Sequence, residues 1–213
     1  MLYRQLGKSG VRVSVIGLGA NRFGHERMPQ EEVNRVIDAA VDLGINFLDS
    51  ANVYTGGRSE ETMGEALKGR REKFVVATKF RSGTGPGPND QGASRYHVMQ
   101  AVEDSLRRLQ TDRIDLYYVH RWDETTPLEE MLCALDDLVR AGKVRYIGAS
   151  NFMAWQLARA NLMAEFHGWS PFVVIQSHYH LLEREVEREL LPFCRDQGVG
   201  LVPYFPLAGG FLT

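Results

Sequence analysis

Short apolar runs, separated by longer amphipathic stretches, recur along the whole chain. These runs are rich in Val, Ile, Leu, Phe and Tyr. They lack the alternation of apolar and polar residues that is typical of a strand with one solvent-exposed face. Continuous apolar runs of this length are typical of strands that are buried on both faces, as in parallel sheets. The pattern predicts strands at residues 15–19, 46–51, 74–79, 114–120, 144–150, 172–178 and 200–204.

Between the predicted strands, apolar residues return at the spacing of one helix face. Four such stripes lie at residues 33–41, 98–109, 128–139 and 186–194. Glycines stand where three of these helices should end, at Gly44, Gly142 and Gly198. A glycine there adopts the left-handed conformation that closes a helix without a steric penalty.

Strands alternating with helices predict an α/β fold with a parallel sheet. Two closures compete: an open doubly wound sheet and an eight-stranded barrel. An open dinucleotide-binding sheet should show a glycine fingerprint at the start of its first helix, but Gly17-Leu18-Gly19 precedes that helix by about ten residues. Residues 3–14 instead form a predicted β-hairpin around a turn at residues 7–10, which could plug the floor of a barrel.

Composition narrows the class of partner. The 213 residues include 25 Lys and Arg against 27 Asp and Glu, a net charge of −2. This charge is too small to favour nucleic acid or an anionic membrane as a partner. No apolar run is long enough to span a bilayer and no secretory signal is visible, while Cys133 and Cys194 form no metal-type pair. We expect a single domain over residues 1–213, located in the cytoplasm.

Polar side chains follow the predicted strands at their carboxyl ends. The set comprises Asp49, Lys79, His120, Asn151 and Gln176. In a barrel these ends converge on one rim, where such enzymes keep their chemistry. A structural ion-pair network at the rim is the competing interpretation.

Tyr54, in the loop after the second strand, adds a candidate proton donor to this set. A phenol is a weak acid near neutral pH, and a buried ammonium such as that of Lys79 stabilises its phenolate. Asp49 would keep Lys79 charged and oriented, while His120 could bind the same substrate oxygen. Such a group delivers a proton to an oxygen that gains negative charge. Nothing in the set supplies electrons, so a hydride-donating cofactor is implied.

At these residues the chain resembles the aldo-keto reductase family. The resemblance rests on residues 44–51 (GINFLDSA), Tyr54 with residues 57–61 (GRSEE), residues 77–79 (ATK), 112–117 (DRIDLY) with His120, 142–151 (GKVRYIGASN) and Gln176. These segments stand in family order and spacing. The GRSEE stretch and residues 180–184 (HLLER) are most similar to the branch of bacterial reductases and potassium-channel β subunits.

The resemblance implies a (β/α)8 TIM barrel with an N-terminal β-hairpin, of which this chain holds the first seven strands. It implies a catalytic tetrad, with Tyr54 as the proton donor to a small-molecule carbonyl substrate, and NADP(H) as cofactor, with NAD(H) left open. The implied tetrad is Asp49, Tyr54, Lys79 and His120; the implied cofactor contacts are Asp49, Ser150, Asn151, Gln176, Tyr204, Leu207 and Gly209; and the implied substrate contacts are Tyr54 and His120. Trp122, two residues beyond His120, lines the substrate pocket or only covers the rim, and we favour the pocket because aromatic walls are common in such sites.

Two departures from the family pattern change the expectations. Phe205 stands where the family commonly has Ser, and the chain stops at Thr213, before an eighth strand and the segment for the 2′-phosphate. We therefore expect a longer natural product, or a fragment that binds NADP(H) weakly or not at all by itself. Unpaired edges on the first and seventh strands would promote association, so a homo-oligomer stays open.

Three other interpretations remain. A regulatory binding module of the channel β-subunit type would keep the tetrad with little turnover. A Schiff-base aldolase would use Lys79, but Asp49 opposes the neutral amine that this chemistry needs. A metal site would start from His178 and His180, which share a strand face, but no further ligand has matching spacing, so we expect no metal.

Overall fold

The computed structural model describes residues 1–213 as a curled sheet of seven strands, ordered β3-β4-β5-β6-β7-β8-β9. Every neighbouring pair is parallel, and β3 and β9 are the two edges of the sheet. The strands are β3 (Leu18–Gly19), β4 (Phe47–Asp49), β5 (Val75–Phe80), β6 (Ile114–Val119), β7 (Val144–Ser150), β8 (Phe172–His178) and β9 (Gly200–Tyr204). The predicted parallel α/β architecture is thereby confirmed, in the curled form of a barrel and not as an open doubly wound sheet.

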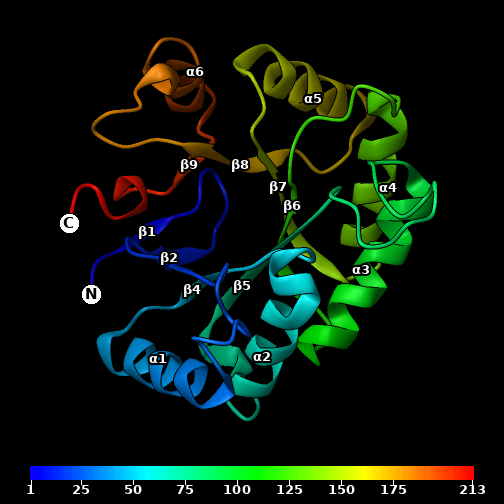
Figure 1. Cartoon of the computed structure of the whole chain (residues 1–213). Coiled ribbons are helices and arrows are strands. Elements are labelled where there is room, and N and C mark those ends of the chain that lie inside the picture. Colours follow the sequence, from blue (N-terminus) through cyan, green and yellow to red (C-terminus); the bar gives the residue numbers. More distant parts are fainter.

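Six α-helices follow the strands and lie outside the curve of the sheet (Figure 1). They are α1 (Gln30–Leu43), α2 (Arg58–Ala66), α3 (Arg95–Leu109), α4 (Leu128–Arg140), α5 (Ala154–His167) and α6 (Leu190–Gln197). Short 3₁₀ turns η1 (Tyr54–Gly57), η2 (Arg71–Lys73), η3 (Glu185–Glu187) and η4 (Ala208–Gly210) lie in the connections. None of the helices combines the length and the apolar character needed to cross a bilayer.

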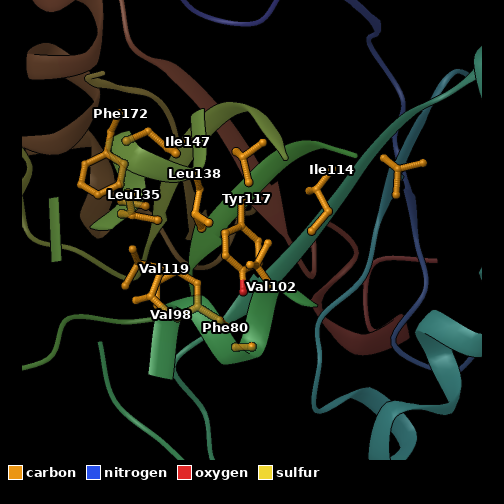
Figure 2. Close-up of a cluster of buried hydrophobic side chains, with 14 of the residues drawn as sticks. Phe80, Val98, Val102, Ile114, Tyr117, Val119, Leu135, Leu138, Ile147 and Phe172 are labelled. Carbon is orange, nitrogen blue, oxygen red and sulfur yellow. The ribbon is translucent and has the colours of Figure 1, made fainter. Parts of the chain in front are cut away.

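The main core fills the space between the sheet and its helices. Figure 2 shows part of it, with Phe80 and Tyr117 of the sheet facing Val98 and Val102 of α3. The Phe80 and Tyr117 rings stack at 4.8 Å between centroids. A second, smaller cluster lies on the other side of the sheet and comprises Leu6, Val13, Phe47, Ala77, Leu116, Tyr118 and Val174. Both faces of the strands are therefore buried, which explains their continuous apolar sequences.

The N-terminal hairpin closes the floor of the barrel. Its strands β1 (Tyr3–Gln5) and β2 (Arg12–Ser14) pair antiparallel, and Leu6 and Val13 contribute to the inner cluster. Gly7 adopts a φ of 59°, and a Cβ at this position would lie 2.1 Å from the carbonyl oxygen of Val173. Only glycine allows this approach of the hairpin turn to the start of β8.

The structure differs from the predicted elements in three places. The first strand is limited to Leu18–Gly19, because Val15 still belongs to the hairpin and donates its backbone N–H to Leu2. Val186 lies in η3, before α6 begins. The sequence stripes also missed α2 and α5. Helix α5 carries apolar residues on both its buried and its exposed sides. Leu157, Ala160 and Ala164 are buried, while Trp155, Leu162 and Phe166 are exposed.

Candidate active site

The four residues of the predicted tetrad lie at one end of the sheet. Asp49 is the last residue of β4, Lys79 lies next to the end of β5, His120 follows β6 directly, and Tyr54 begins η1. Because all strands are parallel, their carboxyl ends share one rim. The structure therefore brings together side chains that are as many as 71 positions apart in sequence, from residue 49 to residue 120.

The Lys79 ammonium is the centre of this group. Its side chain is 0 % exposed and forms an ion pair with Oδ1 of Asp49. It also donates to the backbone carbonyl of Ser50 at 2.7 Å and lies 3.5 Å from the Tyr54 hydroxyl. A buried ammonium is stable only when such partners replace water, so these contacts fix both its charge and its position.

A strained turn orients Tyr54 toward Lys79. Thr55 and Gly56, which follow it, have φ values of 50° and 67°. The left-handed region costs energy for Thr55, and its hydroxyl donates a 2.6 Å hydrogen bond to the carbonyl of Phe23 that helps to hold the turn. The Tyr54 ring meets the His120 ring edge to face, with centroids 5.9 Å apart. The phenol is thus placed between the ammonium and the imidazole.

His120 is neutral at physiological pH. Burial, together with the charges of Lys79 and Arg121, lowers the pKa of its imidazole to about 4. Its Nδ1 is buried without a hydrogen-bond partner in the protein. A neutral imidazole beside a phenol can hydrogen-bond a substrate oxygen without adding a second positive charge next to Lys79.

A second set of polar side chains lies beside the tetrad at the ends of β7, β8 and β9. The Asn151 side-chain amide donates to the His120 carbonyl and to the Ser150 hydroxyl, both at 3.0 Å, and accepts a 2.9 Å bond from the Tyr204 hydroxyl. The Gln176 amide donates at 2.9 Å to Oδ2 of Asp49. The cofactor contacts implied by the sequence are therefore linked directly to the tetrad, a connection that the sequence did not predict.

Tyr204 also packs on His178, which in turn contacts His180. Its ring lies parallel to that of His178, with centroids 5.1 Å apart and planes 7° apart. Nε2 of His178 is 3.2 Å from Nε2 of His180. Nδ1 of His180 accepts hydrogen bonds from the backbone N–H groups of Leu182 and Glu183. The ring proton of His180 is therefore on Nε2, which donates a hydrogen bond to Nε2 of His178. No group of three or more His, Cys, Asp or Glu side chains is arranged to hold a metal ion.

Trp122 belongs to an aromatic cluster beside α5. Its ring meets Phe152 edge to face at 5.1 Å and lies 6.0 Å from the ring of Trp155. It lines a groove of about 400 Å³ together with Trp155 and Arg159. The Trp122 ring packs against this cluster, and its place in a substrate pocket stays a prediction. Leu207 and Gly209 lie in the turns after β9, where Leu207 is half exposed.

A buried ion pair between Glu60 and Arg108 lies behind the tetrad and was not predicted from the sequence, where Glu60 stands only as part of the GRSEE stretch. Glu60 is 0 % exposed; one carboxylate oxygen accepts a 2.5 Å bond from Thr78, and the other accepts a 2.7 Å bond from Arg108. Thr78 precedes Lys79 in β5, with its side chain on the opposite face. This pair therefore connects α2, β5 and α3 directly behind Lys79.

Comparison with known proteins finds a matching family and several similar sequences. The model of the aldo/keto reductase family matches residues 15–213. An aldo-keto reductase of Fusarium vanettenii is 40% identical over 241 residues, covering 99% of this chain and 65% of its own. The oxidoreductase YrpG of Bacillus subtilis is 44% identical, covering 100% of this chain and 68% of its own. A probable voltage-gated potassium channel subunit beta of Arabidopsis thaliana is 39% identical, covering 100% and 66%.

The chain thus spans about two thirds of the length of the curated relatives that it matches. The family match extends over nearly all of the chain and includes every strand of the curled sheet. This match, together with relatives that are 39%, 40% and 44% identical over almost the whole chain, shows that the chain belongs to the aldo/keto reductase family.

Proposed function

We propose that this protein reduces aldehydes or ketones to alcohols, with hydride from NADP(H) and with Tyr54 as the proton donor. The observation that carries the proposal is the position of the Lys79 ammonium, which contacts the Asp49 carboxylate and lies 3.5 Å from the Tyr54 hydroxyl. Membership of a family of oxidoreductases supports the same reaction class. The activity, substrate and partners of the whole protein are part of this proposal.

In this proposal each tetrad residue has one task. The Tyr54 hydroxyl gives its proton to the substrate oxygen, and the adjacent ammonium of Lys79 stabilises the phenolate that remains. Asp49 balances the charge of Lys79 and fixes its position. Neutral His120 orients the substrate oxygen by a hydrogen bond.

The residues beside the tetrad fit the amide end of a nicotinamide. Gln176 uses its amide nitrogen on Asp49, which leaves its Oε1 without a donor from the protein, and the Ser150 hydroxyl accepts from Asn151 and keeps its own proton to donate. A carboxamide offers one donor and one acceptor group to such a pair. Tyr204 stacks on His178 with one face of its ring, and we expect the other face to contact the nicotinamide ring. When bound, the nicotinamide cofactor supplies the hydride. The preference for NADP(H), the cytoplasmic location and the oligomeric state stay predictions.

The test is the oxidation of NADPH, and separately of NADH, in the presence of a panel of aldehydes. Tyr54→Phe should lower the rate by roughly 10²–10⁴-fold, because a positioned general acid contributes about that factor. NADPH binding, followed by fluorescence titration, should change little. Tyr3→Phe is the matched control, since it removes a phenol that only bonds the Gly44 carbonyl at the floor of the barrel. A Tyr54→Phe variant with the wild-type rate would refute the proposed role.

One relative favours a second function, a binding module. The Arabidopsis thaliana relative is a probable channel β subunit. Tight NADPH binding with no turnover of any aldehyde would favour this function over carbonyl reduction. The tetrad geometry would be unchanged, so only the kinetic measurement separates the two.

A further inference from the structure

The buried ammonium of Lys79 has a fourth neighbour besides Asp49, Ser50 and Tyr54. This neighbour is the ring of Tyr118 in β6, whose centroid lies 5.7 Å from Nζ; the Tyr54 ring centroid lies 5.0 Å from the same atom. An ammonium within about 6 Å of an aromatic face is attracted by the ring, and the attraction grows when water is excluded. Lys79 and Tyr118 are both fully buried.

The fold holds the Tyr118 ring firmly inside the barrel. In the sheet register Tyr118 lies opposite Lys79 of β5 on one side and Gly148 of β7 on the other. A Cβ on Gly148 would lie 2.7 Å from two carbon atoms of the ring. The ring therefore occupies space that any other residue at position 148 would fill. Its position is set by three adjacent strands.

The hydroxyl of Tyr118 takes no part in this arrangement. It is buried and makes no hydrogen bond. Burial, reinforced by the charge of Asp49, raises the pKa of this phenol well above 10, so it stays neutral and gives up no proton. Two tyrosines thus lie against one ammonium, and only Tyr54 places its hydroxyl there. What Tyr118 offers to Lys79 is its ring face.

We propose that Tyr118 is a positioning residue, whose ring holds the Lys79 ammonium against Asp49 and the Tyr54 hydroxyl from inside the barrel. This inference rests on the proposed function insofar as it assigns a catalytic task to Lys79. The ring replaces water on the side of the ammonium that carbonyl and carboxylate oxygens do not cover. Without the ring, Lys79 would keep its ion pair but lose its fixed direction toward Tyr54.

The test compares Tyr118→Phe, which keeps the ring, with Tyr118→Leu, which removes it. The readout is the rate of reductive methylation of Lys79, followed by peptide mass spectrometry and normalised to Lys8, Lys68, Lys73 and Lys143. Tyr118→Leu should raise the relative rate at Lys79 by roughly tenfold or more, because the ring interaction of a desolvated ammonium corresponds to about that factor. Tyr118→Phe should match the wild type.

Tyr117→Leu is the matched control. Tyr117 is the next residue of β6 and equally buried, but its ring packs on Phe80 in the main core, away from Lys79. If Tyr117→Leu raises the labelling of Lys79 as much as Tyr118→Leu does, general loosening explains the effect and the inference is wrong. It is also wrong if Tyr118→Phe behaves like Tyr118→Leu. Should Tyr118→Leu not fold, Tyr118→Met removes the ring with a more adaptable side chain.

A kinetic measurement separates this inference from the proposed function. If the wild type reduces aldehydes, Tyr118→Leu should lower kcat by roughly tenfold with little change in the KM for NADPH. Tyr118→Phe should keep the wild-type kcat. The labelling experiment needs no turnover. If the wild type reduces nothing, the proposed function fails while the labelling result still decides whether the ring holds Lys79.

Discussion

The side-chain amide of Gln176 donates a 2.9 Å hydrogen bond to Oδ2 of Asp49, across 127 positions of the chain. The other oxygen of that carboxylate forms the ion pair with Lys79. Gln176 therefore joins the residues expected to bind the cofactor to the residues expected to move the proton.

The first prediction concerns this link. Gln176→Leu should lower kcat for aldehyde reduction by roughly 10- to 100-fold in addition to weakening NADPH binding, because a hydrogen bond to a charged group contributes about 1.5–3 kcal/mol. Ser150→Ala is the control, since the Ser150 hydroxyl has no contact with Asp49 and should affect NADPH affinity more than kcat. Steady-state kinetics over a range of NADPH concentrations separates the two effects. Equal kcat values for both variants would contradict the link.

The second prediction concerns the pH dependence of stability. The pKa of His120 is about 4 in the folded protein, against about 6.5 in an unfolded chain. Between these values the unfolded state binds more protons, so His120 contributes stability that is present above about pH 6.5 and is lost as the pH falls toward 4. Each pH unit in this window corresponds to at most about 1.4 kcal/mol.

The measurement is urea unfolding of the wild type and of His120→Gln at several pH values in this window. The glutamine cannot be protonated, so the free energy of unfolding of the wild type should decrease relative to the variant as the pH falls. Parallel pH curves for the two proteins would show that His120 titrates normally.

The third prediction concerns the buried pair behind the tetrad. Glu60→Ala should lower the free energy of unfolding by about 3–5 kcal/mol, because it leaves Arg108 in a largely buried position without its carboxylate. Glu61→Ala is the matched control, because Glu61 is the same residue type in the same helix and is exposed. Its effect in urea unfolding should stay within about 0.5 kcal/mol. Similar losses for both variants would mean that the pair has no special role.

The fourth prediction concerns the space that the Tyr118 ring occupies. In Gly148→Ala the new methyl group would lie 2.7 Å from the ring and 2.8 Å from Val174. Overpacking of this kind typically costs about 1–3 kcal/mol. Gly10→Ala is the control, because a Cβ there meets no atom within 4 Å and its φ is not in the left-handed region. Thermal unfolding of both variants checks the difference.

The sequence was a good guide wherever one residue class has one structural meaning. Continuous apolar runs correctly predicted buried parallel strands, and Gly44 and Gly198 close α1 and α6 with φ values of 71° and 64°. It failed at α5, where Leu162 and Phe166 are apolar and yet exposed. A helix that is apolar on all sides has no stripe that periodicity can detect.

The candidate site shows the same division. Strand ends and a family resemblance identified Asp49, Tyr54 and Lys79, which the structure places together. The bond from Gln176 to Asp49 and the ring of Tyr118 under Lys79 were not predicted. The bond depends on the curvature of the sheet, which brings β4 and β8 face to face, and the ring contact depends on the register of the adjacent strands β5 and β6. No local pattern in the sequence records either property.

The contact between the hairpin turn and β8 has a consequence for biosynthesis. Gly7 approaches the backbone of Val173 and of Gly200, which begins β9. During synthesis the hairpin is therefore exposed long before the strands that it contacts exist. Residue 200 must emerge from the ribosome before the hairpin can dock. The hairpin is translated before both strands that it contacts, so it reaches its final position late, and until then Leu6 and Val13 are open to other hydrophobic surfaces.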